Sequence, residues 1–134
     1  MNKTTLRAGT TLLAGAMLFS TATASFAGAK DYEFQAVRTD IKQGPGTVVS
    51  VRLVDKRTGK TVPDAVIFTT RMDMAPEGME TMTTPVEASA STEAGVYAFT
   101  TNLSMEGGWR FQIAAKIQGE PETVQGELVL KAVP

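Results

Sequence analysis

The chain has 134 residues, contains neither His nor Cys, and carries a net charge of −1. Because it lacks the commonest general base and the most reactive nucleophile of enzymes, the composition argues against hydrolases and thiol redox proteins. The weakly acidic balance gives no reason to expect binding to nucleic acid or to an anionic membrane surface.

Residues 1–29 have the organisation of a secretory signal peptide. Lys3 and Arg7 supply the positive start, a short apolar run follows, and Ala27-Gly28-Ala29 matches an A-x-A cleavage site. Ser25-Phe26-Ala27 offers a second possible site. The apolar run is shorter than the roughly 20 residues of a membrane-spanning helix. We therefore expect export to the bacterial periplasm, with an inner-membrane anchor only if the segment stays uncleaved.

The remaining residues, 30–134, are enough for one compact domain. They contain 11 basic and 14 acidic residues, which gives a net charge of −3. Because the chain has no cysteine, this domain depends on its apolar core and not on disulfides.

The predicted elements of this domain are strands, because apolar and polar residues alternate with a period of two. The clearest pattern runs from Trp109 to Gln118, and a polar turn follows the second predicted strand at Asp55–Lys60. In chain order the seven predicted strands are Tyr32–Val37, Val49–Leu53, Ala65–Met72, Pro85–Ala90, Val96–Thr101, Trp109–Gln118 and Thr123–Lys131. Seven short strands in about 100 residues are typical of an all-β sandwich of two antiparallel sheets. A small barrel is the alternative.

Methionine is the residue type that stands out. Of the five methionines in residues 30–134, Met72, Met74, Met79 and Met82 fall within twelve residues, and Met105 lies before Gly107-Gly108, where we expect a turn. Pro76 and Gly78 can turn the chain so that Met79 and Met82 approach the first pair. Three or four thioethers could then converge.

A thioether is a neutral, soft ligand, so a methionine cluster favours Cu(I) or Ag(I) over Zn²⁺, Mg²⁺ or Ca²⁺. Since methionine carries no titrating proton, such a site keeps its ligands in acid, where His and Cys ligands are lost. Asp73 and Glu80 lie in the same segment, and we assign them no ligand role.

Two other interpretations of the methionines stay open. Val66, Phe68, Thr70, Met72 and Met74 share one parity, so the two methionines could continue a core-facing row as flexible gap-fillers. Alternatively, exposed methionines serve as an adaptable surface for a protein partner or as sites of oxidation.

Three segments together resemble the YtkA-like and FixH-like periplasmic domains. They are Arg71–Met79, Gly95-Val96-Tyr97 and Met105-Glu106-Gly107-Gly108-Trp109, and the resemblance covers about residues 31–133. It implies an immunoglobulin-like sandwich and an accessory role in copper or heavy-metal handling. The partners it implies are a metal-efflux system or cytochrome oxidase assembly.

The resemblance also implies which residues act. The metal-binding positions fall on Met72, Met74, Met79, Met82 and Met105, and Trp109 is expected in the core. We therefore predict a non-enzymatic periplasmic protein that binds Cu(I) or Ag(I) and passes it to an export machine. The alternative is an interaction module that binds no metal and contacts an efflux adaptor or oxidase assembly protein.

Overall fold

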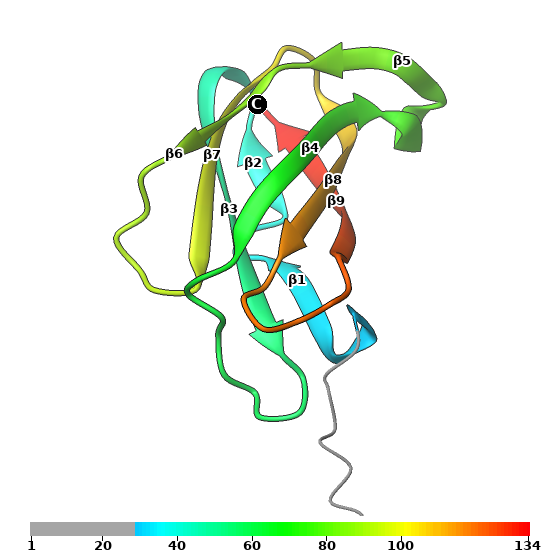
Figure 1. Cartoon of the computed structure of the whole chain (residues 1–134). Coiled ribbons are helices and arrows are strands. Elements are labelled where there is room, and N and C mark those ends of the chain that lie inside the picture. The colour runs from blue at the N-terminus through cyan, green and yellow to red at the C-terminus, as the bar shows by residue number, and fades with distance from the viewer. Residues whose placement is uncertain (1–28) are drawn as a thin grey trace, which may run out of the picture.

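The computed structural model describes residues 29–134, which fold into two stacked β-sheets (Figure 1). The predicted signal peptide lies outside the described residues, apart from Ala29. One sheet has four strands, in the order β1 (Tyr32–Ala36), β3 (Gly44–Asp55), β7 (Val96–Leu103) and β6 (Val86–Ser89). The other has five, in the order β2 (Asp40–Lys42), β9 (Val124–Val133), β8 (Gly107–Lys116), β4 (Val66–Met74) and β5 (Met79–Thr84). Two short 3-10 turns, η1 (Ala29–Asp31) and η2 (Ala75–Glu77), are the other secondary-structure elements of the described residues.

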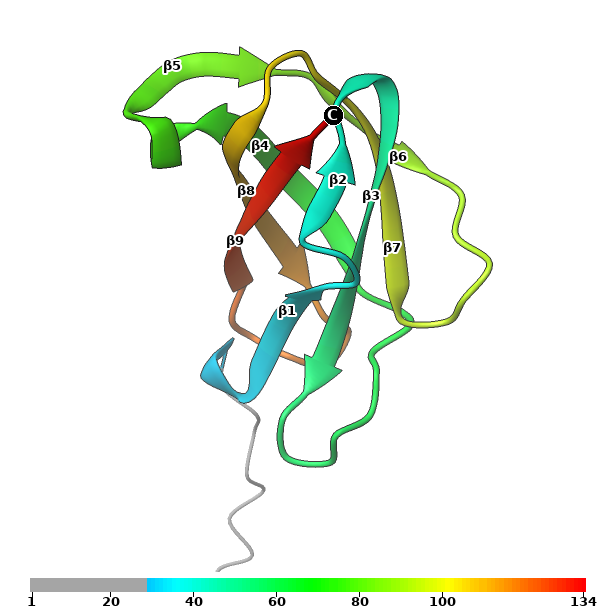
Figure 2. The same cartoon turned by 180° about the vertical axis from the view of Figure 1, so that it is seen from behind.

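The predicted all-β sandwich is confirmed, with nine strands in place of about seven, and the two separate sheets exclude the alternative of a small barrel. Each of the seven predicted strands is present with shifted ends. The two additional strands are β2, in which only Ile41 is buried, and β5, which follows the turn expected at Pro76 and Gly78 and for which no strand was predicted. All pairs are antiparallel except β2 and β9, which run parallel and lie side by side in Figure 2.

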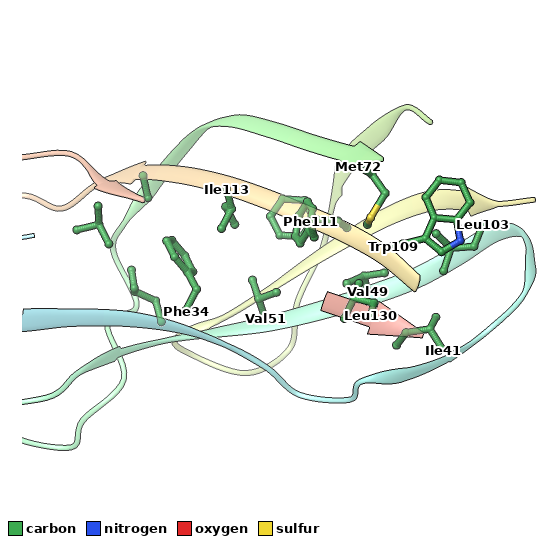
Figure 3. Close-up of a cluster of buried hydrophobic side chains, with 14 of the residues drawn as sticks. Phe34, Ile41, Val49, Val51, Met72, Leu103, Trp109, Phe111, Ile113 and Leu130 are labelled. Carbon is green, nitrogen blue, oxygen red and sulfur yellow. The ribbon is translucent and has the colours of Figure 1, made fainter. Parts of the chain in front are cut away.

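The core lies between the sheets and is built on the strand that the sequence marked most clearly. Trp109, Phe111 and Ile113 of β8 are each no more than 2% exposed. They point toward Val49 and Val51 of β3 across the interior (Figure 3). Burial of such large apolar side chains is the main stabilising contribution in a domain without disulfides.

A β-bulge interrupts β4 near its start. Ile67 lies opposite Ala115 of β8, and Thr69 lies opposite the next residue, Ala114, so Phe68 is an extra residue in β4. An extra residue in one strand reverses which side chains face the core on either side of it.

The bulge explains where the parity argument goes wrong. Val66 and Phe68 were expected to share the core-facing row of Met72 and Met74, but they are 66% and 54% exposed. Met72 and Met74 lie beyond the bulge and are 1% and 0% exposed. The expected row is therefore correct only for its second half.

Candidate functional site

The predicted methionine segment forms a hairpin of β4, η2 and β5. Pro76 stands in the first turn of η2, and Gly78 ends it with a φ of 73°, a left-handed conformation that glycine adopts without a steric cost. The Gly78 backbone N–H donates to the Ala75 carbonyl at 2.8 Å. The turn expected at Pro76 and Gly78 is present, and it places Met79 directly opposite Met74.

The hairpin methionines differ in exposure. Met72 and Met74 belong to the buried core, and Met72 points into the interior beside Phe111 and Trp109 (Figure 3). Met79 and Met82 are only partly buried and pack against the same core. All four therefore border one apolar cluster, in which the first pair packs as the gap-filler interpretation predicts.

The hairpin pairing is irregular next to Met74. Asp73 pairs with Thr83, whereas Met74 pairs with Met79, so residues 80–82 bulge out of β5. The Arg71 side chain reaches this bulge and donates from Nη2 to the Glu80 carbonyl at 3.0 Å. This hydrogen bond fixes the backbone of the segment that carries Met82.

Met105 comes from the loop between β7 and β8, at the same end of the sandwich as β5 (Figure 1). It is 40% exposed, and its carbonyl accepts a hydrogen bond from Trp109 Nε1 at 3.0 Å. The expected burial of Trp109 is confirmed, since this residue is 1% exposed.

Glu77 ties the hairpin turn to the start of β8. Its carboxylate accepts a hydrogen bond from the Gly108 N–H at 2.7 Å. A Cβ atom on Gly108 would lie 2.8 Å from Pro76 Cβ, and one on Gly107 would lie 2.9 Å from Glu77 Oε1. The expected turn at Gly107-Gly108 is therefore wrong: the two glycines are the first two residues of β8, where their lack of side chains lets η2 approach closely.

Asp73 is the buried charge of the hairpin. It points to the outer face of its sheet, is 0% exposed, and lies opposite Arg110 of β8. Its carboxylate accepts bonds from Arg110 Nη2 at 2.7 Å and Nε at 3.1 Å, from Arg71 Nε at 2.9 Å, and from the Ala75 N–H at 3.0 Å. Every partner of Asp73 thus belongs to the hairpin or to the strand beside it.

Burial raises the pKa of Asp73, but the hydrogen bonds from Arg110, Ala75 and Arg71 outweigh it, so the pKa lies below its usual value of 3.8. The same pairing raises the pKa of Arg110. Asp73 therefore stays ionised at neutral pH and holds the start of η2 in place.

Sequence reasoning missed Asp73, Arg110 and Glu77 as the residues that fix the methionine hairpin. Asp73 and Arg71 have the opposite parity from Met72, and Arg110 alternates with buried Trp109, so the pattern does place these charges on the outer face. Their meeting depends on the register between β4 and β8, which no local pattern gives.

The family model described as YtkA-like matches residues 26–114, well over half of the sequence. The chain belongs to the YtkA-like family. The matched region contains the whole hairpin and most of β8, so the resemblance to YtkA-like domains is confirmed over these residues. None of the curated proteins compared with the chain matches it.

Two solved structures are similar to this YtkA-like chain in overall fold. The crystal structure of the Lin-41 filamin domain is 24% identical, with a TM-score of 0.43, over 76% of this chain and 97% of that one. The ZirS C-terminal domain is 11% identical, with a TM-score of 0.42, over 84% of this chain and 74% of that one.

Within residues 29–134 of this YtkA-like chain, no three Asp or Glu side chains come together in a way that could hold a metal ion. The methionines are the soft ligands that the sequence provides, since it has neither His nor Cys. Among the same residues, no helix is long and apolar enough to cross a bilayer.

Proposed function

We propose that this protein is a periplasmic, non-enzymatic accessory protein that binds Cu(I) or Ag(I) through methionine thioethers and serves metal efflux or homeostasis. Its metal is cargo, taken from the periplasm and passed to an export machine. The proposed ligands are Met72, Met74, Met79 and Met82, with Met105 as a fifth.

The observation that carries the proposal is that the five methionines of residues 30–134 gather at one end of the sandwich. Four lie on the β4–β5 hairpin. The loop that carries Met105 leads to Gly108, which packs so closely on the hairpin turn that a side chain there would clash, and whose N–H donates a hydrogen bond to Glu77 of that turn. Core gap-filling alone gives no reason for every methionine to occupy one end, since the apolar core extends along the whole length of the strands.

The chemistry of the donor set favours a soft monovalent ion. Thioethers are neutral and polarisable, and they suit Cu(I) better than the oxygen-seeking divalent ions. They bind without releasing a proton, so the affinity should depend little on pH. Membership of the YtkA-like family supports the proposal, because the resemblance implies copper or heavy-metal handling.

Burial sets the order in which the sulfurs meet the metal. Met79 and Met82 retain solvent-exposed surface, whereas Met72 and Met74 are enclosed by the core. We assign first contact to Met79 and Met82, and completion of the ligand set to the two inner methionines after β5 shifts outward. β5 pairs with β4 at only three positions, and residues 80–82 take no part in that pairing, so few ladder bonds oppose the shift.

The complete burial of Met72 and Met74 favours a second candidate function, an interaction module that binds no metal. In that case these two side chains only fill the core, and the hairpin end contacts an efflux adaptor or an oxidase assembly protein. Leucine should then replace methionine with little effect, because swaps that conserve volume usually cost under about 1.5 kcal/mol.

Anaerobic titration with Cu(I) against a chromophoric chelator, at neutral and mildly acidic pH, separates the two functions. The wild-type protein should compete for one Cu(I) at both values. A variant with Met72, Met74, Met79 and Met82 changed to Leu should lose that competition while it keeps its fold.

A second variant tests the proposed fifth ligand, which lies outside the hairpin. Met105→Leu should weaken the affinity only in part, because the four hairpin thioethers remain. Absence of competition by the wild-type protein, or equal competition by the fourfold variant, would exclude a thioether carrier and favour the interaction module.

A further inference from the structure

Trp109 is the one tryptophan of the chain, and it lies among the methionines of the candidate site. Asp73 of β4 pairs with Arg110 of β8. The next position on these antiparallel strands therefore sets Met74 opposite Trp109, and Met72 lies diagonally from it. Opposite and diagonal side chains on one face of a sheet are within reach of a large aromatic ring, so Trp109 neighbours both inner methionines.

The indole ring of Trp109 is held in one orientation inside the apolar cluster. It is 1% exposed, and Met72 lies beside it in the interior (Figure 3). Its one polar atom, Nε1, donates to the Met105 carbonyl at 3.0 Å, which satisfies the N–H of the buried ring. Trp109 thus links the two inner methionines of the hairpin to the loop that carries the fifth methionine.

The interior beside Trp109 offers a metal ion no negative charge. No carboxylate belongs to the apolar cluster of residues 29–134. The nearest buried carboxylate, that of Asp73, lies on the outer face of the sheet and is already paired with Arg71 and Arg110. Thioethers are neutral, so an ion held by sulfur alone brings an uncompensated positive charge into apolar surroundings, which is unfavourable.

We propose that Trp109 is a further metal-binding residue, whose indole ring stabilises Cu(I) or Ag(I) held by Met72 and Met74 through a cation–π interaction. This inference rests on the proposed function and adds a residue to that site. The face of an aromatic ring is negative, and tryptophan attracts cations more strongly than tyrosine or phenylalanine. The attraction is strongest for a desolvated cation, as an ion beside this buried ring would be. The methionines supply the sulfur ligands, and the ring supplies the negative potential that they lack.

Phe111 is the other aromatic residue beside Met72, and its position fits the role less well. It lies two residues further along β8 from the hairpin turn, and its ring packs edge-to-face on Phe99 with 5.2 Å between the ring centroids. Trp109 lies nearer to the turn and to the partly exposed methionines of β5, to which we assign first contact with the metal. An ion that enters from this end therefore approaches Trp109 before Phe111.

Fluorinated tryptophan tests the ring while it nearly conserves the shape of the side chain. Because the chain has one tryptophan, protein expressed in a tryptophan auxotroph with the fluorinated amino acid changes at Trp109 alone. Each fluorine withdraws electrons from the ring face and weakens its attraction for a cation. In the anaerobic chelator titration, the Cu(I) affinity should fall from the unsubstituted to the monofluoro and then to the difluoro form, by about fivefold in total.

Two further measurements separate metal contact from packing. Urea denaturation of the metal-free proteins should give nearly equal midpoints for the three forms, because the core packing is conserved. The emission of Trp109 in the unsubstituted protein should change as Cu(I) is added and stop changing at one equivalent. If circular dichroism shows that a fluorinated form is unfolded, Trp109→Phe and Trp109→Leu replace the series, and the phenylalanine variant should bind Cu(I) more tightly.

The outcomes distinguish this inference from the proposed function. Cu(I) binding by the wild-type protein with an affinity that fluorination does not change would overturn the role of Trp109 and leave the thioether carrier in place. Absence of Cu(I) binding by the wild-type protein would overturn both.

Discussion

The two halves of β4 are neighbours in one strand, but their surroundings differ completely. Val66 and Phe68 lie before the bulge, are largely exposed and border an open edge. Met72 and Met74 lie after it, are enclosed by the core and are paired with β5 on their outer side. One extra residue therefore separates an exposed part of the strand from a segment fixed inside the fold.

The largest difference between the halves should appear on truncation. Met72→Ala removes a buried side chain from the core and should lower the free energy of unfolding by about 3–4 kcal/mol. Phe68→Ala removes a larger but exposed side chain and should change it by less than about 1 kcal/mol. Urea denaturation of both variants measures the difference. Equal losses would show that Phe68 is packed and that the bulge does not separate the halves.

The second comparison concerns the charge between the two buried methionines. Asp73→Asn weakens the bonds from Arg71 and Arg110 and should lower the free energy of unfolding by about 2–3 kcal/mol, as expected for buried hydrogen bonds to a charged group. Glu127→Gln is the control, because its carboxylate is exposed and 3.6 Å from Arg110.

The same network gives a pH dependence. The folded-state pKa of Asp73 lies below its usual value, so its contribution is complete above about pH 4 and is lost as the pH falls through the folded pKa. In metal-free protein, acid denaturation followed by circular dichroism should therefore show a shallower loss of stability below that pH in Asp73→Asn. An unchanged slope would mean that Asp73 titrates alike in both states.

The smallest effect separates methionines by exposure and leaves the fold intact. Under mild peroxide, Met105 should form sulfoxide first, Met79 and Met82 more slowly, and Met72 and Met74 last, because oxidation requires access to sulfur. Peptide mass spectrometry over time gives the order. Early oxidation of Met72 would show that the hairpin opens readily in solution.

Periodicity predicted the sandwich because most strands have one buried and one wetter face, as in the alternation of Trp109 with Arg110 and of Phe111 with Gln112. It missed β2, whose single buried residue, Ile41, makes no pattern, and β5, whose irregular register hides any alternation.

The candidate site was predictable in part for a similar reason. Pro76 and Gly78 predict the turn, so the approach of Met79 to Met74 could be predicted from the local sequence. The bulge at Phe68 and the meeting of Asp73 with Arg110 depend on register across β4 and β8, which only the tertiary fold sets. Local pattern thus predicts turns and faces, but not the position at which a face reverses.

The most direct test of the proposed function is nuclear magnetic resonance of protein labelled with ¹³C at the methionine methyl groups, recorded anaerobically as Cu(I) is added. The proposal predicts that the methyl resonances of Met79, Met82, Met72 and Met74 shift together and stop changing at one equivalent, at neutral and at mildly acidic pH. Resonances that stay in place, or a shift confined to Met105, would contradict a thioether site in the hairpin.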